Sequence, residues 1–290
     1  MSMDLKTITV FLDATASGRK RAVHAATLAQ RWGAHLVGVH VTFAGVTFPP
    51  SMSYARGREA AKQWIAYEQQ LDASAEAAAA KVGAQFQATC ARLGVSGEFR
   101  PIGQGWSTED WSAEDAVVNS LHSDLVVVGH PEPNGLPGRM LPVGILLASG
   151  VPLLVVPNAW EGETIGSRIL VGWNATREAR RAVSDSLNFL VAAKSVTVLV
   201  IDPASRHQHG DEPGADIAIQ LARHGAHVDV EQVSSSGNPV AQVILHYALK
   251  RASDLLVIGA YSHARLSEIL LGGVTRTLLA QMPVPVLISR

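Results

Sequence analysis

The sequence has almost no cysteine and almost no net charge. Cys90 is the single cysteine of 290 residues, so the chain cannot form an internal disulfide, which agrees with a reducing compartment. We interpret its side chain as a small buried hydrophobic group. The 24 basic and 25 acidic residues give a net charge of −1, so bulk charge gives no reason to expect a nucleic-acid or anionic-membrane partner.

Long hydrophobic runs are also missing. The apolar runs at 125–129 and 153–157 are far shorter than the roughly 20 residues that span a bilayer. The N-terminus lacks the basic region, the long apolar stretch and the small-residue cleavage site of an export signal. We therefore expect a cytoplasmic protein without a membrane partner.

What the sequence does contain is an internal repeat. Residues 8–13 (ITVFLD) are followed by Ala-Thr and then by Arg-Ala-Val, and residues 169–174 (ILVGWN) are followed by the same two motifs. Residues 123–129 return as 253–259, and each half closes on Val-Pro with an apolar run. Such self-similarity indicates two homologous units. We place the domains at 1–160 and 161–290.

Each half alternates short apolar runs with helical patterns, which predicts βαβ units and parallel sheets. In the second half the predicted strands are 169–173, 195–201, 227–233, 255–259 and 284–288, and the predicted helices are 178–192, 216–224 and 240–250. The fold class is therefore α/β, a doubly wound sheet flanked by helices.

The first half is longer than the second, and its surplus falls at 43–93. Alanine content and apolar spacing there favour helix. A single helix over 58–93 would be about 54 Å long at 1.5 Å per residue. We expect either a break, with Gly83 as the candidate, or a protruding arm.

A glycine-rich segment follows the fourth apolar run of the second half. Gly259, Gly272 and Gly273 precede a helical pattern at 276–281. Glycines let backbone N–H groups approach a ligand, and a helix N-terminus offers unpaired donors and partial positive charge. The segment is a candidate phosphate cradle, although glycine loops also occur as plain turns.

The spacing of this segment, with Gly259, position 262 and the pair Gly272-Gly273, resembles the ATP-binding pattern Gly-x2-Gly-x9-Gly-Ser/Thr of the universal stress protein family. The resemblance covers the second half, and the repeat extends it to the first. It implies a tandem protein of two Rossmann-like domains, each with a five-stranded parallel sheet flanked by helices.

The resemblance also implies the binding residues. Asn174 stands where the family usually has an Asp, Val200 or Ile201 would lie by adenine, and the ribose and phosphates would be surrounded by Gly259, Ser262, Gly272, Gly273, Val274 and Thr275. His263 lies within the same segment and would either touch phosphate or face solvent. This sequence departs from the pattern at Ser262, which replaces a glycine, at Gly273, which replaces a hydroxyl residue, and at Asn174. Thr275 offers a hydroxyl instead.

The corresponding loop of the first half does not match. Three prolines remove N–H donors between 130 and 138, and Glu132 would bring negative charge toward a polyphosphate. We expect no ATP site there. Asp13 is then a strand-end or helix-capping acid, with Thr15 or Ser17 as the cap.

The predicted function is that of a stress-response regulatory protein. It would bind ATP or a related adenine nucleotide in its C-terminal domain, with Mg²⁺ entering alongside, and occupancy would modulate the protein. The halves would pair as an internal pseudo-dimer through their terminal strands, and chains would associate as a homo-oligomer. Two alternatives stay open, a nucleotide-free scaffold and a slow ATPase. No hydrolase or metal-binding motif is present, and we assign no catalytic or metal residues.

Overall fold

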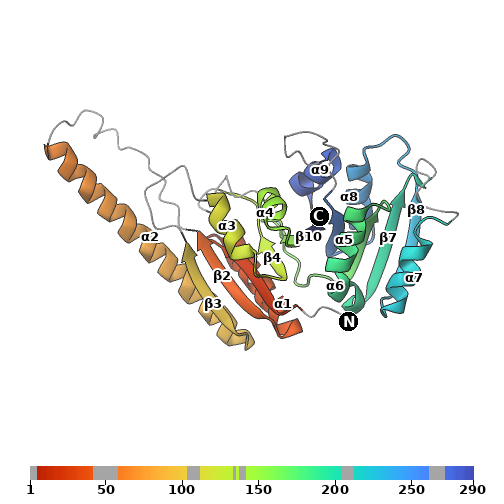
Figure 1. Cartoon of the computed structure of the whole chain (residues 1–290), viewed down its shortest axis with the longest axis horizontal. Coiled ribbons are helices and arrows are strands. Elements are labelled where there is room, and N and C mark those ends of the chain that lie inside the picture. The colour runs from red at the N-terminus through yellow and green to blue at the C-terminus, as the bar shows by residue number, and fades with distance from the viewer. Residues whose placement is uncertain are drawn as a thin grey trace.

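The computed structural model describes residues 5–41, 58–102, 112–132, 135–136, 142–203, 212–260 and 272–290. Within them, the chain forms two α/β halves that share one ten-stranded sheet (Figure 1). Its strands are short, and all but the two edge strands are apolar and mostly buried on both faces, as expected for a parallel sheet covered by helices. The predicted fold class is confirmed.

The first half contains five strands and four helices in its described residues. They are β1 (Thr7–Leu12), α1 (Ala16–Trp32), β2 (His35–Val41), α2 (Arg58–Leu93), β3 (Gly97–Ile102), α3 (Ser112–Ser120), β4 (Leu125–Val128), α4 (Pro142–Ser149) and β5 (Leu153–Val155).

The second half repeats this order. Its elements are β6 (Arg168–Trp173), α5 (Arg177–Asp185), α6 (Leu187–Ala192), β7 (Ser195–Ile201), α7 (Ala215–Arg223), β8 (Val228–Val233), α8 (Val240–Lys250), β9 (Leu255–Gly259), α9 (Gly273–Gln281) and β10 (Val286–Ser289).

The strand order across the sheet is β3-β2-β1-β4-β5-β10-β9-β6-β7-β8. Neighbouring strands are parallel within each half. In each half the order reverses beside the first strand, between β1 and β4 and between β6 and β9. Open α/β sheets bind ligands at such a reversal, beyond the carboxyl ends of the strands.

The halves meet at an antiparallel pair of strands, β5 and β10, the last strand of each half. Val286, Leu287 and Ile288 pair with Val155, Leu154 and Leu153. This is the terminal-strand pairing expected from the sequence. It makes the two five-stranded sheets continuous.

Helices also connect the halves, because α1 of the first half contacts α6 of the second. The ring of Trp32 meets that of Phe189 edge-on, with centroids 4.5 Å apart, and the Arg31 guanidinium donates to the Ala192 carbonyl at 3.0 Å. Nearby, the His24 ring lies 4.9 Å from that of Trp160. One hydrophobic core therefore runs through both halves.

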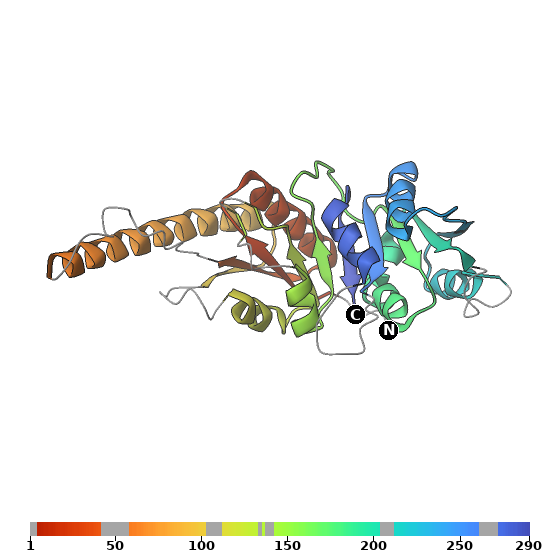
Figure 2. The same cartoon turned by 90° about the horizontal axis from the view of Figure 1, so that it is seen from above.

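Helix α2 is one unbroken helix of 36 residues. Near its C-terminal end Val82, Phe86 and Cys90 are buried, and its N-terminal part protrudes from the sheet (Figures 1 and 2). The expected arm is present, and the expected break at Gly83 is wrong. A Cβ at Gly83 would lie 2.8 Å from the Phe99 ring, so this glycine allows close packing against β3.

The predicted single helix at 178–192 is also wrong, because the structure divides it into α5 and α6. Ser186 lies between them, and its hydroxyl donates to the Ala182 carbonyl at 2.7 Å. A serine that bonds back to the fourth preceding carbonyl often bends a helix. The interruption therefore has a local cause.

We expect Phe189→Ala to lower the free energy of unfolding by about 3 to 5 kcal/mol, the usual range for truncating a buried phenylalanine. Phe189 is fully buried and faces Trp32 across the two halves. Urea unfolding followed by circular dichroism measures the change. Leu249→Ala is the control, since Leu249 is 62% exposed. An equal decrease in the free energy of unfolding in both variants would contradict a stabilising role of the buried Phe189 side chain.

Candidate functional site

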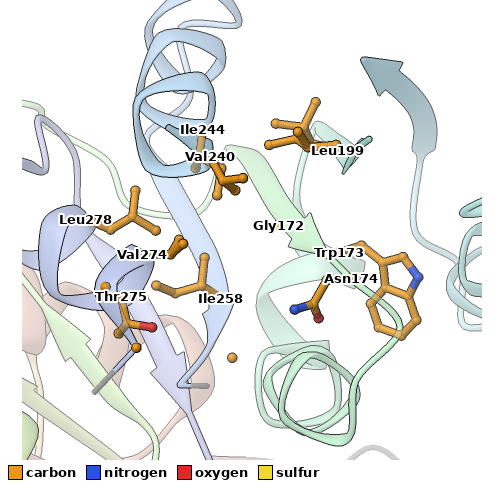
Figure 3. Close-up of a pocket in the computed structure, with 14 residues that line it drawn as sticks. Gly172, Trp173, Asn174, Leu199, Val240, Ile244, Ile258, Val274, Thr275 and Leu278 are labelled. Atoms are coloured by element: carbon orange, nitrogen blue, oxygen red, sulfur yellow. The ribbon is translucent and has the colours of Figure 1, made fainter. Parts of the chain in front are cut away.

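A pocket lies at the strand-order reversal of the second half, beyond the carboxyl ends of β6, β7 and β9 (Figure 3). Its cavity volume is about 170 Å³. The lining residues come from three strands, from the N-terminal parts of two helices, and from single residues next to a strand and a helix. They are Gly172, Trp173, Asn174, Leu199, Ile201, Val240, Ile244, Ile258, Gly259, Gly272, Gly273, Val274, Thr275 and Leu278.

Most of the site residues expected from the sequence line this pocket. They are Asn174, Ile201, Gly259, Gly272, Gly273, Val274 and Thr275. Ser262 and His263 lie outside the described residues. Val200 does not line the pocket, because successive side chains of a strand face opposite sides. It is fully buried in the core on the other side of the sheet.

One side of the pocket is apolar. Leu199 and Ile201 come from β7, Val240 and Ile244 from α8, and Ile258 from β9. Val240 and Ile244 are four residues apart, so they share one face of α8. Such a surface suits a flat heterocycle better than a charged group.

The opposite side of the pocket is built from glycines and a helix terminus. Helix α9 begins at Gly273, and its N-cap Gly272 makes no side-chain cap hydrogen bond. The first N–H groups of a helix have no partner within the helix. Thr275, on the first turn, lines the pocket and is buried. This side therefore offers hydrogen-bond donors and the positive end of a helix dipole.

Gly259 and Gly273 differ in the space around them. A Cβ at Gly259 would lie 2.4 Å from the carbonyl carbon of Glu178, because the first turn of α5 packs directly against the end of β9. A Cβ at Gly273 would meet no atom within 4 Å among the described residues. Gly259 is thus required by packing, whereas Gly273 leaves open space at the pocket.

Asn174 is held by the N-cap of α5. Thr176 caps this helix by accepting from the Ala179 N–H at 3.3 Å, and its hydroxyl donates to Asn174 Oδ1 at 2.8 Å. The Asn174 side chain is therefore fixed by the same residue that starts the helix.

The sequence reasoning missed the apolar side of the pocket. No sequence motif marks four of the residues that line the pocket, Trp173, Leu199, Val240 and Ile244. The alternation of side chains along β7 was a usable signal, because it places Leu199 on the same face as Ile201. The position of α8 beside that face depends on tertiary packing.

The second half matches a family model. Residues 167–290 match that of the universal stress protein family. The C-terminal half is a universal stress protein domain. Among curated proteins, none matches the sequence.

Solved structures extend the likeness to the fold of the whole chain. A universal stress protein from Archaeoglobus fulgidus is similar with a TM-score of 0.67 at 14% identity, over 98% of this chain and 96% of that chain. A protein of unknown function from Pseudomonas aeruginosa gives a TM-score of 0.53 at 17% identity, over 98% of this chain and 92% of that chain. The architecture around the universal stress protein domain is therefore also found in other proteins.

At the corresponding strand ends of the first half, two charged side chains pair with each other. Asp13, at the end of β1, forms a buried ion pair with Arg21 of α1. The Arg21 Nε also donates to the Phe11 carbonyl at 2.8 Å. A Cβ at Gly129 would overlap this guanidinium, so Arg21 lies against the glycine that corresponds to Gly259. Burial lowers the pKa of Arg21, while the Asp13 carboxylate opposes the shift.

Asp13 and Glu132, the acid expected to be unfavourable for ATP, both accept hydrogen bonds from residues of this half. Thr15 is the N-cap of α1, as one of the two predicted caps, and donates to Asp13. Glu132 accepts from the Ser17 hydroxyl.

Across the described residues, no group of three or more His, Cys, Asp or Glu side chains is arranged to hold a metal ion. Within the same ranges, no helix is long and apolar enough to cross a bilayer.

Two histidines border the ion pair. Burial lowers the pKa of His40, whose Nδ1 donates to the Leu12 carbonyl at 2.9 Å. Burial and the positive charge of Arg21 lower the pKa of His130. Both shifts favour the neutral imidazole in the folded protein.

We expect the protein to lose stability as pH falls from 7 to 5. Because the folded-state pKa of His130 lies below its ordinary value of 6.5, the unfolded chain binds more protons in this range and unfolding is favoured. The melting temperature of His130→Gln should fall less steeply with decreasing pH than that of the wild type. At pH 8 both proteins carry a neutral side chain here, so their difference there sets the baseline. If the melting temperatures of the two proteins fall in parallel with pH, His130 does not contribute to the pH dependence of stability.

Proposed function

We propose that this protein is a stress-response regulator that binds ATP or a related adenine nucleotide in the pocket of its second half. The observation that carries the proposal is that one pocket combines an apolar wall with the start of α9, whose first N–H groups have no partner within the helix. It acts in the cytoplasm as a ligand-modulated binding module, with domains at 1–160 and 161–290.

The pocket residues fit the two ends of a nucleotide. The base would lie against Leu199, Ile201 and Val240, and the phosphates would accept from the backbone of Gly272 and Gly273. The Thr275 hydroxyl would replace the hydroxyl that the family pattern has after its last glycine. Mg²⁺ would enter with the phosphates.

One nucleotide per chain is the stoichiometry that we propose. At the matching strand ends of the first half, Asp13 is already paired with Arg21 in the interior. A ligand that took Arg21 away from Asp13 would leave a buried carboxylate without its partner, which is costly.

Occupancy would also change the outer surface of the domain. Val240 and Val274 line the pocket while 37% and 41% exposed. A ligand covering them would alter the apolar surface available to a second copy of the chain. We propose that nucleotide binding modulates a homo-oligomer in this way. Light scattering with and without ATP tests it, and an unchanged mass would contradict it.

We expect Gly273→Val to weaken ATP binding at least tenfold, about 1.4 kcal/mol. The added side chain enters open space at the pocket, so it blocks the ligand without disturbing the core. Isothermal titration calorimetry measures the affinity. Gly144→Val is matched to it, because Gly144 is also in a helix and also has open space around its Cβ. Equal affinities of the two variants would contradict the proposed site.

We expect ATP at about 100 times its dissociation constant to raise the free energy of unfolding by about 2.7 kcal/mol. Urea titrations with and without nucleotide measure the difference. If ATP, AMP and cyclic AMP all leave stability unchanged at millimolar concentration, the nucleotide-free scaffold is the better description. Sustained phosphate release that a Gly273→Val variant loses would instead indicate an ATPase.

A further inference from the structure

The orientation of the Asn174 amide is fixed by hydrogen bonds. The Thr176 hydroxyl accepts from the Ala179 N–H, so its own proton is directed at Asn174. The Thr176 backbone N–H, which can only donate, lies 3.4 Å from the same Asn174 oxygen. An amide oxygen accepts and an amide nitrogen donates. The oxygen therefore faces Thr176, and the nitrogen faces away from it.

The nitrogen of this amide is directed into the pocket. In Figure 3 it points toward Thr275, on the first turn of α9. Asn174 is only partly buried, and among the residues that the structure describes, its nitrogen has no hydrogen-bond partner. Two N–H donors are thus directed toward the side of the pocket that includes the start of α9.

The first half shows what the same position does when it carries a charge. Asp13 Oδ1 accepts from Thr15 as Asn174 does from Thr176, and its other oxygen pairs with Arg21. The N-cap bonds align Thr15 and Gly18 with Thr176 and Ala179. In this alignment the Arg-Ala-Val motif is shifted by one residue, so Arg21 matches Ala182, a buried alanine, and not Arg181, which pairs with Asp185.

The second half therefore lacks both members of the ion pair at these two positions. A carboxylate at 174 would have no arginine at position 182 to pair with, as Asp13 has in Arg21, and would repel an anion in the pocket. An amide instead adds donors to those of the α9 N-terminus. Compared with the first half, the second half has Asn174 in place of an aspartate and Ala182 in place of an arginine. Together these differences remove a negative charge that would repel an anionic ligand.

We propose that the Asn174 amide nitrogen donates to a phosphate oxygen of the bound nucleotide and so makes affinity depend on the phosphate group. This inference rests on the proposed function, because it assigns a role within the same pocket. It makes Asn174 a specificity-determining residue that distinguishes nucleotides from nucleosides.

The test compares Asn174→Asp with the wild type for ATP, AMP and adenosine by isothermal titration calorimetry, in buffer containing EDTA. Hydrogen bonds to charged groups contribute about 1.5–3 kcal/mol, so we expect ATP affinity to fall at least tenfold. AMP should lose affinity too, whereas adenosine should stay within about twofold. Asn174→Ala should lose less ATP affinity than Asn174→Asp, because it removes the donor without adding charge.

Asn238→Asp is the matched control for charge, since Asn238 is exposed and does not line this pocket. It should leave ATP affinity within about twofold. Lowering the pH should also bring the affinity of Asn174→Asp for ATP back toward that of the wild type, because a protonated carboxyl can donate. A purely structural role of Asn174 would not produce this pH dependence.

Three outcomes separate the possibilities. Unchanged ATP affinity in Asn174→Asp would overturn the inference, and so would an equal loss for adenosine, which would place Asn174 at the base or ribose. If the wild type binds neither ATP, AMP nor adenosine, the proposed function itself fails, and this inference fails with it. Circular dichroism confirms that each variant is folded before its affinity is compared.

Discussion

The pairing of β5 with β10 is the constraint on which the rest of the molecule depends. Its residues are apolar and at most 1% exposed. The two sheets therefore join through apolar surface, and exposing that surface to water would destabilise either half. The contact of Trp32 with Phe189 extends this junction to the helices. Both strands also pair in parallel with a neighbouring strand of their own half. The junction therefore fixes the positions of the strand ends in each half.

The strand ends of the two halves have diverged. Both have a polar residue at the end of the first strand, a threonine N-cap and a glycine at the end of the fourth strand. In the first half the glycine makes room for the Arg21 guanidinium, and in the second half it makes room for the backbone of α5. Two replacements, Asn174 against Asp13 and Ala182 against Arg21, distinguish the strand ends that line a pocket from those that carry an internal ion pair.

Most of the fold could be predicted from the sequence, because the apolar runs of the buried strands and their repetition are local signals. Strand β9 lies where its run predicted, and α2 follows its alanine-rich pattern. The interruption at Ser186 depends on one side-chain hydrogen bond, and the packing at Gly83 depends on Phe99 from another element. Much of the candidate pocket followed from glycine spacing. Its apolar wall, and the insertion of Arg21 beside Asp13, required the three-dimensional arrangement of helices that no local pattern specifies.

The junction strands also bear on how such a chain arises. A half of this molecule on its own would have an apolar strand at its margin, with main-chain donors and acceptors unmet. Association with a second, identical half through the same antiparallel contact would satisfy them. Gene duplication followed by fusion turns such a two-fold pair into one polypeptide. Once fused, the partners no longer have to stay alike, and one can change the residues at its strand ends while it continues to support the other.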